Sequence, residues 1–379
     1  AMARLTLPRI MVAVIAVLLL TYAFAIAPRA TSVRRGDVGN IGAATAQPSA
    51  SPSASPRNPE LFPPDGKKFI GVTTDKGVYD FTPVDGFTKA AKRQPQVMLF
   101  SVGWASSKFD RTLFDRIADR GMLPMLAWEP WDYRLDEAAR KQGITQKKID
   151  QLRSDQPDYR LSHLARGDLD SYVLSWAKGI KSLGYTVAIR FAHEMNGDWY
   201  PWCEAVNGNQ PGEYIAAWRH VHDVFRAAGA TNVTWVWSPN ILWWGSSTKL
   251  SALYPGDNYV DWLGLSGYYG GGKAYRSFDA IFNATIERLR TFSKRPLVIT
   301  ETGASDRSGR KAEWINETFR LLARHTEIIG LIWFEVNKES DWRIVSSQAA
   351  AAAFAQAVAA PAYDLRWSPS TVPRTELKN

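Results

Sequence analysis

Cysteine is almost absent from this 379-residue sequence, and its scarcity limits the chemistry available to the protein. Cys203 stands alone, which excludes an intrachain disulfide and every zinc or iron–sulfur motif built on cysteines. We expect it to be a buried thiol without a catalytic role. Histidine is also scarce, and the segment HEMNG at 193–197 lacks the second histidine of a helical zinc motif. We therefore expect no metal and no cofactor, and chemistry based on carboxylates and hydroxyls.

Two further features are missing. No glycine-rich phosphate loop follows an early strand, which argues against a doubly wound open sheet. No basic arm or face is evident either, because the 46 Lys and Arg residues are dispersed among 37 Asp and Glu residues and leave a net charge of +9. A nucleic-acid binder would need its basic residues clustered. Nucleic acid is therefore not an expected partner.

The N-terminus carries an uncharged apolar run at residues 10–27, preceded by Arg4 and Arg9. Such a run is a signal peptide or a membrane anchor. Its length, and Pro28 directly after Ala27, favour an uncleaved anchor, and we assign 1–27 to this segment. Residues 28–66 are rich in Ala, Ser and Pro and predict a disordered linker. The protein is expected at the extracellular face of a membrane, or secreted, as a monomer.

From residue 67 to 365, short apolar runs alternate with amphipathic stretches, a pattern typical of β-α units around a parallel sheet. Eight such units predict a (β/α)8 barrel, whose active site lies at the C-terminal ends of its strands. Residues 366–379 are expected to be a disordered tail. The predicted strands are 68–74, 96–102, 122–128, 185–192, 232–238, 260–266, 296–301 and 330–336, and the clearest helices are 109–121, 170–184, 212–229, 278–292, 311–325 and 346–361.

Tryptophan is unusually abundant, with 16 residues, and most of them follow the ends of predicted strands. Indole rings beside Asn, Glu and Asp suit sugars, whose C–H faces stack on aromatics while polar groups take the hydroxyls. For any single tryptophan, packing under a loop is an equal alternative, and the clustering favours ligand contact. The candidate binding residues at these strand ends are Trp104, Trp128, Glu129, Trp131, His193, Asn196, Trp199, Trp202, Trp237, Asn240, Tyr268, Trp333 and Trp342.

Glu194 and Glu301 follow the fourth and seventh strands, each after a buried run that would hold its backbone rigidly. Hydrolysis of a glycosidic bond needs one acid to protonate the leaving oxygen and one carboxylate at the anomeric carbon. Glu129, Glu335, Glu339 and Asp341 compete for these roles, but binding or ion pairing suits them better. Arg190 shares strand parity with Glu194, so it should point into the barrel, where it either keeps Glu301 ionised or only satisfies a buried carboxylate.

These residues resemble the retaining glycoside hydrolases of the large (β/α)8 clan, and more narrowly glycoside hydrolase family 26. Most of the clan has Asn before the acid/base Glu, whereas family 26 has His, and this chain reads RFAHEMNG at 190–197. WSPN at 237–240, Tyr268, ETG at 301–303, WF at 333–334 and KESDW at 338–342 also match. The similarity spans residues 67 to about 345.

The resemblance implies a role for each matched residue. Glu194 would be the acid/base and Glu301 the nucleophile. Tyr268 would hydrogen-bond the nucleophile, and His193 would orient the acid/base or contact the sugar. Trp333 would form the floor of the subsite that holds the distorted sugar ring.

Residues 197–202 read GDWYPW, closer to family members that act on mixed-linkage β-glucan than to mannanases. We therefore expect a retaining endo-β-glycanase acting on β-1,4 bonds of a mixed-linkage β-glucan or β-mannan. A non-catalytic glycan-binding barrel is one alternative, and a hydrolase or transglycosylase trimming an endogenous surface polysaccharide is another. The polar insertion at 132–161 is expected to decide between endo and exo cleavage.

Overall fold

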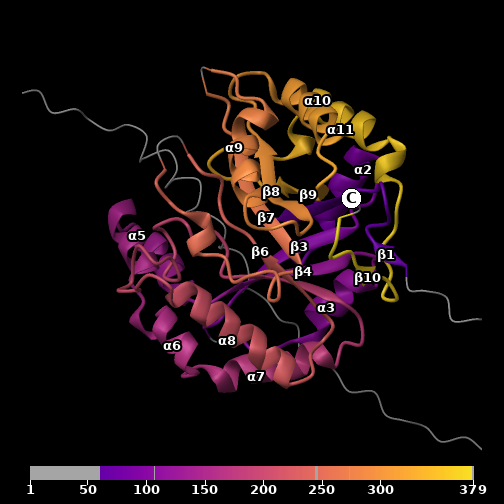
Figure 1. The fold of residues 1–379 in the computed structure, drawn as a ribbon. Coiled ribbons are helices and arrows are strands. Elements are labelled where there is room, and N and C mark those ends of the chain that lie inside the picture. Colours follow the sequence, from indigo (N-terminus) through magenta and orange to yellow (C-terminus); the bar gives the residue numbers. More distant parts are fainter. Residues whose placement is uncertain (1–59, 106, 244–245, 273, 378–379) are drawn as a thin grey trace, which may run out of the picture.

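The computed structural model describes residues 60–377 except 106, 244–245 and 273, and its centre is a closed barrel of eight parallel strands (Figure 1). Each strand pairs with the next along the chain, and β2 pairs with β9 to close the ring. The predicted (β/α)8 barrel is confirmed. The strands are β2 (Phe69–Thr74), β3 (Val97–Gly103), β4 (Leu123–Glu129), β5 (Val187–Phe191), β6 (Val233–Trp237), β7 (Trp262–Tyr269), β8 (Leu297–Ala304) and β9 (Ile328–Glu335).

Helices surround the barrel and bury the outer faces of its strands, as Figure 1 shows. Almost every strand residue is buried, because one side chain in two fills the barrel interior and the other packs under a helix. This double burial explains why the strands read as continuous apolar runs. The helices of the outer layer are α2 (Thr82–Ala91), α3 (Arg111–Ala118), α7 (Asp170–Lys181), α8 (Glu213–Ala227), α9 (Phe278–Arg290), α10 (Lys311–Leu322) and α11 (Gln348–Val358).

The polar insertion after β4 is mostly helical. It comprises α4 (Arg134–Lys141), α5 (Gln146–Ser154), η1 (Pro157–Tyr159) and α6 (Leu161–Arg166). The guanidinium of Arg153 is buried and pairs with Asp136, so an internal ion pair joins α5 to α4. Three further short 3-10 turns follow the later strands and α11: η2 (Leu250–Ala252), η3 (Ile344–Ser346) and η4 (Pro361–Tyr363).

The end of the chain differs from the expected disordered tail. Val372–Pro373 forms β10, which pairs in parallel with β1 (Leu61–Phe62), and Trp367 is buried. Arg374 donates to the Pro63 carbonyl at 2.9 Å, and its own carbonyl accepts from the Trp262 indole at 2.6 Å. The prediction for 366–379 is therefore wrong for residues 366–377, and the ordered body begins before residue 67. The low hydropathy of this segment led to the prediction of disorder. Backbone pairing and one buried arginine hold the segment in place instead.

The two terminal strands lie at the base of the barrel, opposite the ends that carry Glu194 and Glu301. Phe62 of β1 stacks on Phe69, the first residue of β2, with ring centroids 5.5 Å apart. Phe69 in turn stacks on Trp262, the first residue of β7, at 5.7 Å. These rings close the N-terminal end of the barrel.

The proposed anchor at 1–27 and most of the linker at 28–66 lie outside the described residues. Within the part of the chain that the structure describes, no helix combines the length and apolarity needed to cross a membrane.

Candidate functional site

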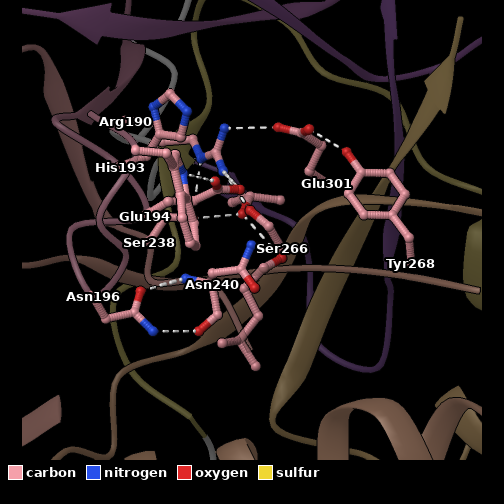
Figure 2. Close-up of polar contacts among 12 residues, drawn as sticks. Arg190, His193, Glu194, Asn196, Ser238, Asn240, Ser266, Tyr268 and Glu301 are labelled. Carbon is pink, nitrogen blue, oxygen red and sulfur yellow. Dashed lines mark hydrogen bonds and ion pairs between the residues drawn. The ribbon is translucent and has the colours of Figure 1, made fainter. Parts of the chain in front are cut away.

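Glu194 and Glu301 lie together at the C-terminal mouth of the barrel, and both side chains are almost fully buried. Arg190 lies between them (Figure 2). Its Nη1 donates to Glu301 Oε2 at 2.9 Å, and its Nη2 is 3.9 Å from Glu194 Oε1. One guanidinium thus contacts both carboxylates, and the expectation that Arg190 points into the barrel is confirmed.

Hydroxyl groups from three other strands hold Arg190 in place. Its Nε donates to Ser238 Oγ at 3.0 Å, and Nη2 donates to Ser266 Oγ at 2.6 Å. Ser238 Oγ lies 2.8 Å from Thr300 Oγ1, which donates to the Leu265 carbonyl. The hydroxyls of Ser238, Ser266 and Thr300 therefore all have hydrogen-bond partners, and the Arg190 guanidinium is held in place before any ligand binds.

Ser238, Ser266 and Thr300 are not among the site residues expected from the sequence. A serine or threonine at an inward position of an otherwise apolar strand is the signal that would have found them. Gly264 is part of the same layer, because a Cβ there would lie 2.6 Å from the Cβ of Ser238. The small residues thus leave room for the arginine in the barrel interior.

A β-bulge in β8 turns Glu301 towards the mouth. In the pairing of β7 with β8, Leu265 faces Ile299 and Ser266 faces Glu301, so Thr300 is an extra residue. Thr300 and Glu301 therefore both contact the interior, although adjacent residues of a regular strand point to opposite faces. Bulges often re-aim a side chain beside a functional site.

The backbone around Glu194 is strained. Ala192 and Glu194 adopt left-handed conformations, with φ of 43° and 55°, which residues other than glycine rarely adopt. The Glu194 N–H donates to the Ser238 carbonyl at 2.7 Å, and the Ala192 N–H donates to the Trp128 carbonyl at 3.1 Å. Bonds to the neighbouring strands thus hold this turn, which follows directly on β5.

The loop at 199–203 folds back over Glu194. The indole N–H of Trp199 donates to Glu194 Oε2 at 3.0 Å, and that of Trp202 donates to the His193 carbonyl at 2.7 Å. The Cys203 thiol donates to the Glu194 carbonyl at 3.6 Å. Burial raises the pKa of that thiol to about 12, and the prediction of a buried cysteine is confirmed.

The electrostatics of the site differ between its carboxyl groups. Burial raises the pKa of Glu194, the charge of Glu301 raises it further, and Arg190 opposes both effects. The same physics acts on Glu129, whose pKa burial raises to about 8. Trp131 lowers it in part, through an indole N–H donated to Glu129 Oε2 at 3.0 Å. Glu129 and Glu194 are therefore both buried carboxyl groups whose surroundings raise the pKa and favour the protonated form.

His193 lies beside Glu129, with its Nδ1 4.0 Å from Glu129 Oε1. Burial and the nearby Arg190 lower the pKa of the ring, so the imidazole is neutral. Neither ring nitrogen has a hydrogen-bond partner among the described residues. The ring is held by edge contact with Tyr200 and by Trp202. A buried polar ring with unused donor and acceptor positions suits a polar ligand.

On the other side of Arg190, the Tyr268 hydroxyl donates to Glu301 Oε1. The hydrogen bond that the family resemblance implied is thus present in the structure. Phe334 packs edge-on against the Tyr268 ring at 5.6 Å, and Trp342 lies at 5.1 Å. The Trp342 indole nitrogen is buried and lacks a hydrogen-bond partner within the described residues.

The eight strand-end tryptophans divide into two groups. Trp131 and Trp199 donate to Glu129 and Glu194, while Trp202 lies against His193 and Trp342 against Tyr268. Trp128 instead packs under Trp176 of α7 and Phe225 of α8, and Trp104 packs against Trp128 and Tyr172. The expectation of sugar contact is therefore wrong for Trp104 and Trp128.

The same correction applies to two tryptophans on later strands. The Trp237 ring lies against Tyr254 and Phe292 on the outside of the barrel. Trp333 lies against Trp314 of α10 and Phe354 of α11, so it does not floor the pocket. Strand alternation is the reason, since the inward residues beside these two are Ser238 and Phe334.

Asn196 and Asn240 join two loops at the mouth. The Asn196 amide donates to the Asn240 carbonyl at 2.9 Å and accepts from the Asn240 N–H at 2.8 Å. This pairing uses both ends of the Asn196 side chain, so Asn196 holds the loop after β5 against the loop after β6.

No group of His, Cys, Asp and Glu residues suited to a metal ion occurs in the described part of the chain.

Residues 130–304 match the model of the family described as Glycosyl hydrolase family 26. Endoglucanase H of Acetivibrio thermocellus is 33% identical over 310 residues, which cover 78% of this chain and 31% of that protein. A mannan endo-1,4-beta-mannosidase of Bacillus subtilis is 29% identical over 135 residues, 34% of each chain. This chain therefore spans about a third of the length of these relatives.

Solved structures agree on the fold. A GH26 beta-mannanase of Bacteroides ovatus superposes with a TM-score of 0.55 at 20% identity, over 79% of this chain and 90% of that one. The GH26 domain of an endo-beta-mannanase/endo-beta-glucanase from Prevotella bryantii gives 0.54 at 15% identity, with the same coverage. The barrel, the family match and the sequence similarity together indicate a glycoside hydrolase fold. Residues 130–304 of this barrel belong to glycoside hydrolase family 26, and the similarity to Endoglucanase H extends over 78% of the chain.

Proposed function

We propose that this protein is a retaining endo-β-glycanase that hydrolyses internal β-1,4 bonds of a polysaccharide by double displacement. The observation that carries the proposal is the contact of one buried guanidinium, that of Arg190, with both Glu194 and Glu301. Retaining enzymes hold their two carboxyl groups about 5 to 5.5 Å apart, whereas inverting enzymes leave room for a water between them. A shared guanidinium favours the closer spacing.

In the first step, a Glu301 oxygen attacks the anomeric carbon and the glycosidic C–O bond breaks. Glu194 gives its proton to the leaving oxygen. Burial and the charge of Glu301 keep that proton on Glu194 at neutral pH, because both raise the pKa of Glu194. Arg190 and Tyr268 hold the Glu301 carboxylate through one hydrogen bond to each of its oxygens, so the nucleophile is oriented towards the pocket.

In the second step, Glu194 is a carboxylate and takes a proton from water. The water oxygen attacks the anomeric carbon, the ester bond to Glu301 breaks, and the sugar leaves with its original configuration. The indole N–H of Trp199 donates to Glu194 and stabilises its ionised form during this step. The reaction needs no cofactor.

For the substrate we propose a mixed-linkage β-glucan ahead of a β-mannan. The similarity to Endoglucanase H extends over 78% of this chain, whereas the Bacillus subtilis mannosidase matches 34%. The sequence GDWYPW at 197–202 supports the same preference. His193 and Glu129, which face each other across 4.0 Å, are proposed to bind sugar hydroxyls, with Trp131 and Trp202 beside them and Trp342 beside Tyr268.

The test is to incubate the protein with lichenan, galactomannan, glucomannan, cellulose and β-1,3-xylan and to follow new reducing ends. Release of reducing ends from lichenan by the wild type, with none by Glu301→Ala, supports the proposal. Release from galactomannan alone would identify mannan as the substrate instead. Glycan binding without turnover would contradict it and favour a non-catalytic barrel. Activity confined to a polymer of the producing cell would favour surface trimming.

We also propose that the protein acts outside the cytoplasm, as a membrane-anchored or secreted monomer. The support is the uncharged apolar run at 10–27 and the Pro-, Ser- and Ala-rich stretch after it. Cell fractionation with an antibody to the barrel tests this, and recovery in the cytosol alone would contradict it.

A further inference from the structure

A buried lysine holds the loop that carries Trp342. Lys311 is fully buried at the first position of α10. Its Nζ donates to the carbonyls of Asp341 and Arg343 at 3.0 and 2.6 Å and to Ser346 Oγ at 2.9 Å. An ammonium group has three donors, and here all three bind the same six-residue loop, 341–346.

A buried carboxylate holds the same loop through its amides. Glu335, the last residue of β9, accepts from the Ile344 N–H at 2.8 Å and from the Val345 N–H at 3.4 Å. The loop therefore gives carbonyls to a cation and amides to an anion. The side chain of Asp341 also pairs with Arg343 through two short contacts, which closes the turn around Trp342.

Trp342 itself is fixed at both backbone groups. Its N–H donates to the Val336 carbonyl at 3.0 Å, and its carbonyl accepts from the Trp333 indole at 3.0 Å. Trp333 thus acts on the site through Trp342 although its own ring lies outside the barrel.

From Trp342 the contacts lead directly to the carboxylate at the mouth. The Trp342 ring packs on Tyr268, and the Tyr268 hydroxyl donates to Glu301. A shift of the loop would move this ring and with it the hydrogen bond to Glu301. Misplacement of a reacting group by about 1 Å costs about 100-fold in rate.

General stability is a poor explanation for the lysine. A cation at the start of a helix opposes the helix dipole, and burial of an ammonium group is costly. Buried charged groups are often no more stabilising than apolar residues of the same volume. The contacts of Lys311 and Glu335 do fix one geometry, since their donors and acceptors are satisfied in a single arrangement of the loop.

We propose that Lys311 and Glu335 are positioning residues, which hold the loop 341–346 so that Trp342 fixes Tyr268 against Glu301. The kinetic part of this inference rests on the proposed function, and the part that concerns the loop does not. Neither residue touches the reacting atoms. Their loss is expected to lower kcat roughly 10- to 100-fold while KM changes far less.

The experiment compares Lys311→Met with Lys68→Met as a matched control. Burial lowers the pKa of both lysines to about 8, and the Lys68 Nζ donates to the carbonyls of His325 and Ile328 at the base of the barrel. Hydrogen exchange of the Trp342, Ile344 and Val345 amides is followed in both variants, together with kcat and KM on the polymer that the wild type cleaves. Glu335→Ala and Glu335→Gln form a second pair.

Faster exchange of the three amides and a lower kcat in Lys311→Met, with neither in Lys68→Met, is the expected result. Glu335→Gln keeps an acceptor for Ile344 and should recover most of the kcat lost in Glu335→Ala. Unchanged exchange, wild-type kcat, or an equal loss in Lys68→Met would overturn the inference. If the wild type cleaves no polymer, the proposed function fails, and exchange alone then decides whether the two residues hold the loop. The Glu335 pair gives the same decision should Lys311→Met not fold.

Discussion

The indole N–H of Trp199 donates to Glu194 Oε2 at 3.0 Å, so an aromatic side chain five residues further along the chain is a polar partner of the proposed proton donor. Gly197 makes this contact feasible. A Cβ at Gly197 would lie 2.5 Å from the Trp199 ring, and any larger residue would displace the indole.

Trp199→Phe should move the alkaline limit of activity to higher pH. The indole hydrogen bond favours the ionised form of Glu194, so its loss raises the pKa of a carboxyl group that burial and Glu301 already raise. The protonated acid then persists to higher pH. At the optimum, kcat/KM should fall by roughly tenfold or less, because the proton donor remains. A pH profile of kcat/KM checks this, and an alkaline limb that moves to lower pH would contradict it.

Glu194→Ala should discriminate between leaving groups. A general acid contributes about 10²- to 10⁴-fold, and a substrate with a good leaving group does not need it in the first step. The glycosylation rate should therefore collapse for the polymer and change little for an activated aryl glycoside. Pre-steady-state release of the aryl alcohol measures that step. An equal loss on both substrates would refute the proposed role.

Arg190→Met should destabilise the fold most at neutral pH. It leaves the buried carboxylate of Glu301 without its cation, which typically costs about 3–5 kcal/mol. The loss should shrink in acid, because Arg190 lowers the pKa of Glu194 and a protonated Glu194 loses less when the cation is removed. Urea unfolding at pH 7 and pH 4 provides the comparison. Arg226, an exposed arginine of α8 paired with Asp223, is the control, and Arg226→Met should have no measurable effect.

Glu129→Gln should gain stability relative to the wild type as the pH rises. Burial raises the pKa of Glu129 to about 8, whereas an unfolded glutamate titrates near about 4.3. The folded protein therefore binds the extra proton between these values, and wild-type stability falls as the pH rises through this range. A glutamine does not titrate, so the variant does not lose stability in this way. Its side-chain oxygen can still accept the hydrogen bond from the Trp131 indole. Melting temperatures of both proteins at pH 5, 6.5 and 8 test this, and a constant difference would speak against it.

Arg374→Ala should lower stability although it lies in a segment of low hydropathy. Its side chain donates to the Pro63 carbonyl and pairs with Asp65, and it is 7% exposed. Removal leaves a buried carbonyl without its donor, at a cost of about 1–3 kcal/mol. Arg366, an exposed arginine of the same segment, supplies the control. Equal denaturation midpoints for the two variants would mean that the segment adds nothing.

The sequence predicted the barrel because strand burial leaves a strong local signal. Apolar, β-branched runs of similar length recur eight times, and each observed strand of the barrel overlaps its predicted range. The sequence also pointed to Glu194 and Glu301, since each ends such a run and neither can serve the core, and the structure places both beside Arg190. The hydrogen bond from Tyr268 to Glu301 came only from the family resemblance.

The side to which a residue points was harder to predict. Trp237 and Trp333 follow the alternation of their strands and lie outside the barrel, while Thr300 and Glu301 break it through a bulge. A bulge depends on the pairing of two strands, and a single strand does not reveal it. The ordered C-terminal segment was missed for a similar reason, because its partner β1 lies about 310 residues earlier in the chain.

The pairing of β1 with β10 brings both ends of the folded body to one place. Residue 60 enters and residue 377 leaves beside β1 and β10 at the N-terminal end of the barrel, while Glu194 and Glu301 lie at its C-terminal mouth. Whatever is joined to the body at either end is therefore attached on the side away from the two carboxylates. A polymer bound at the mouth as proposed would approach and depart without crossing the point of attachment, and immobilisation through either end would leave the mouth unobstructed.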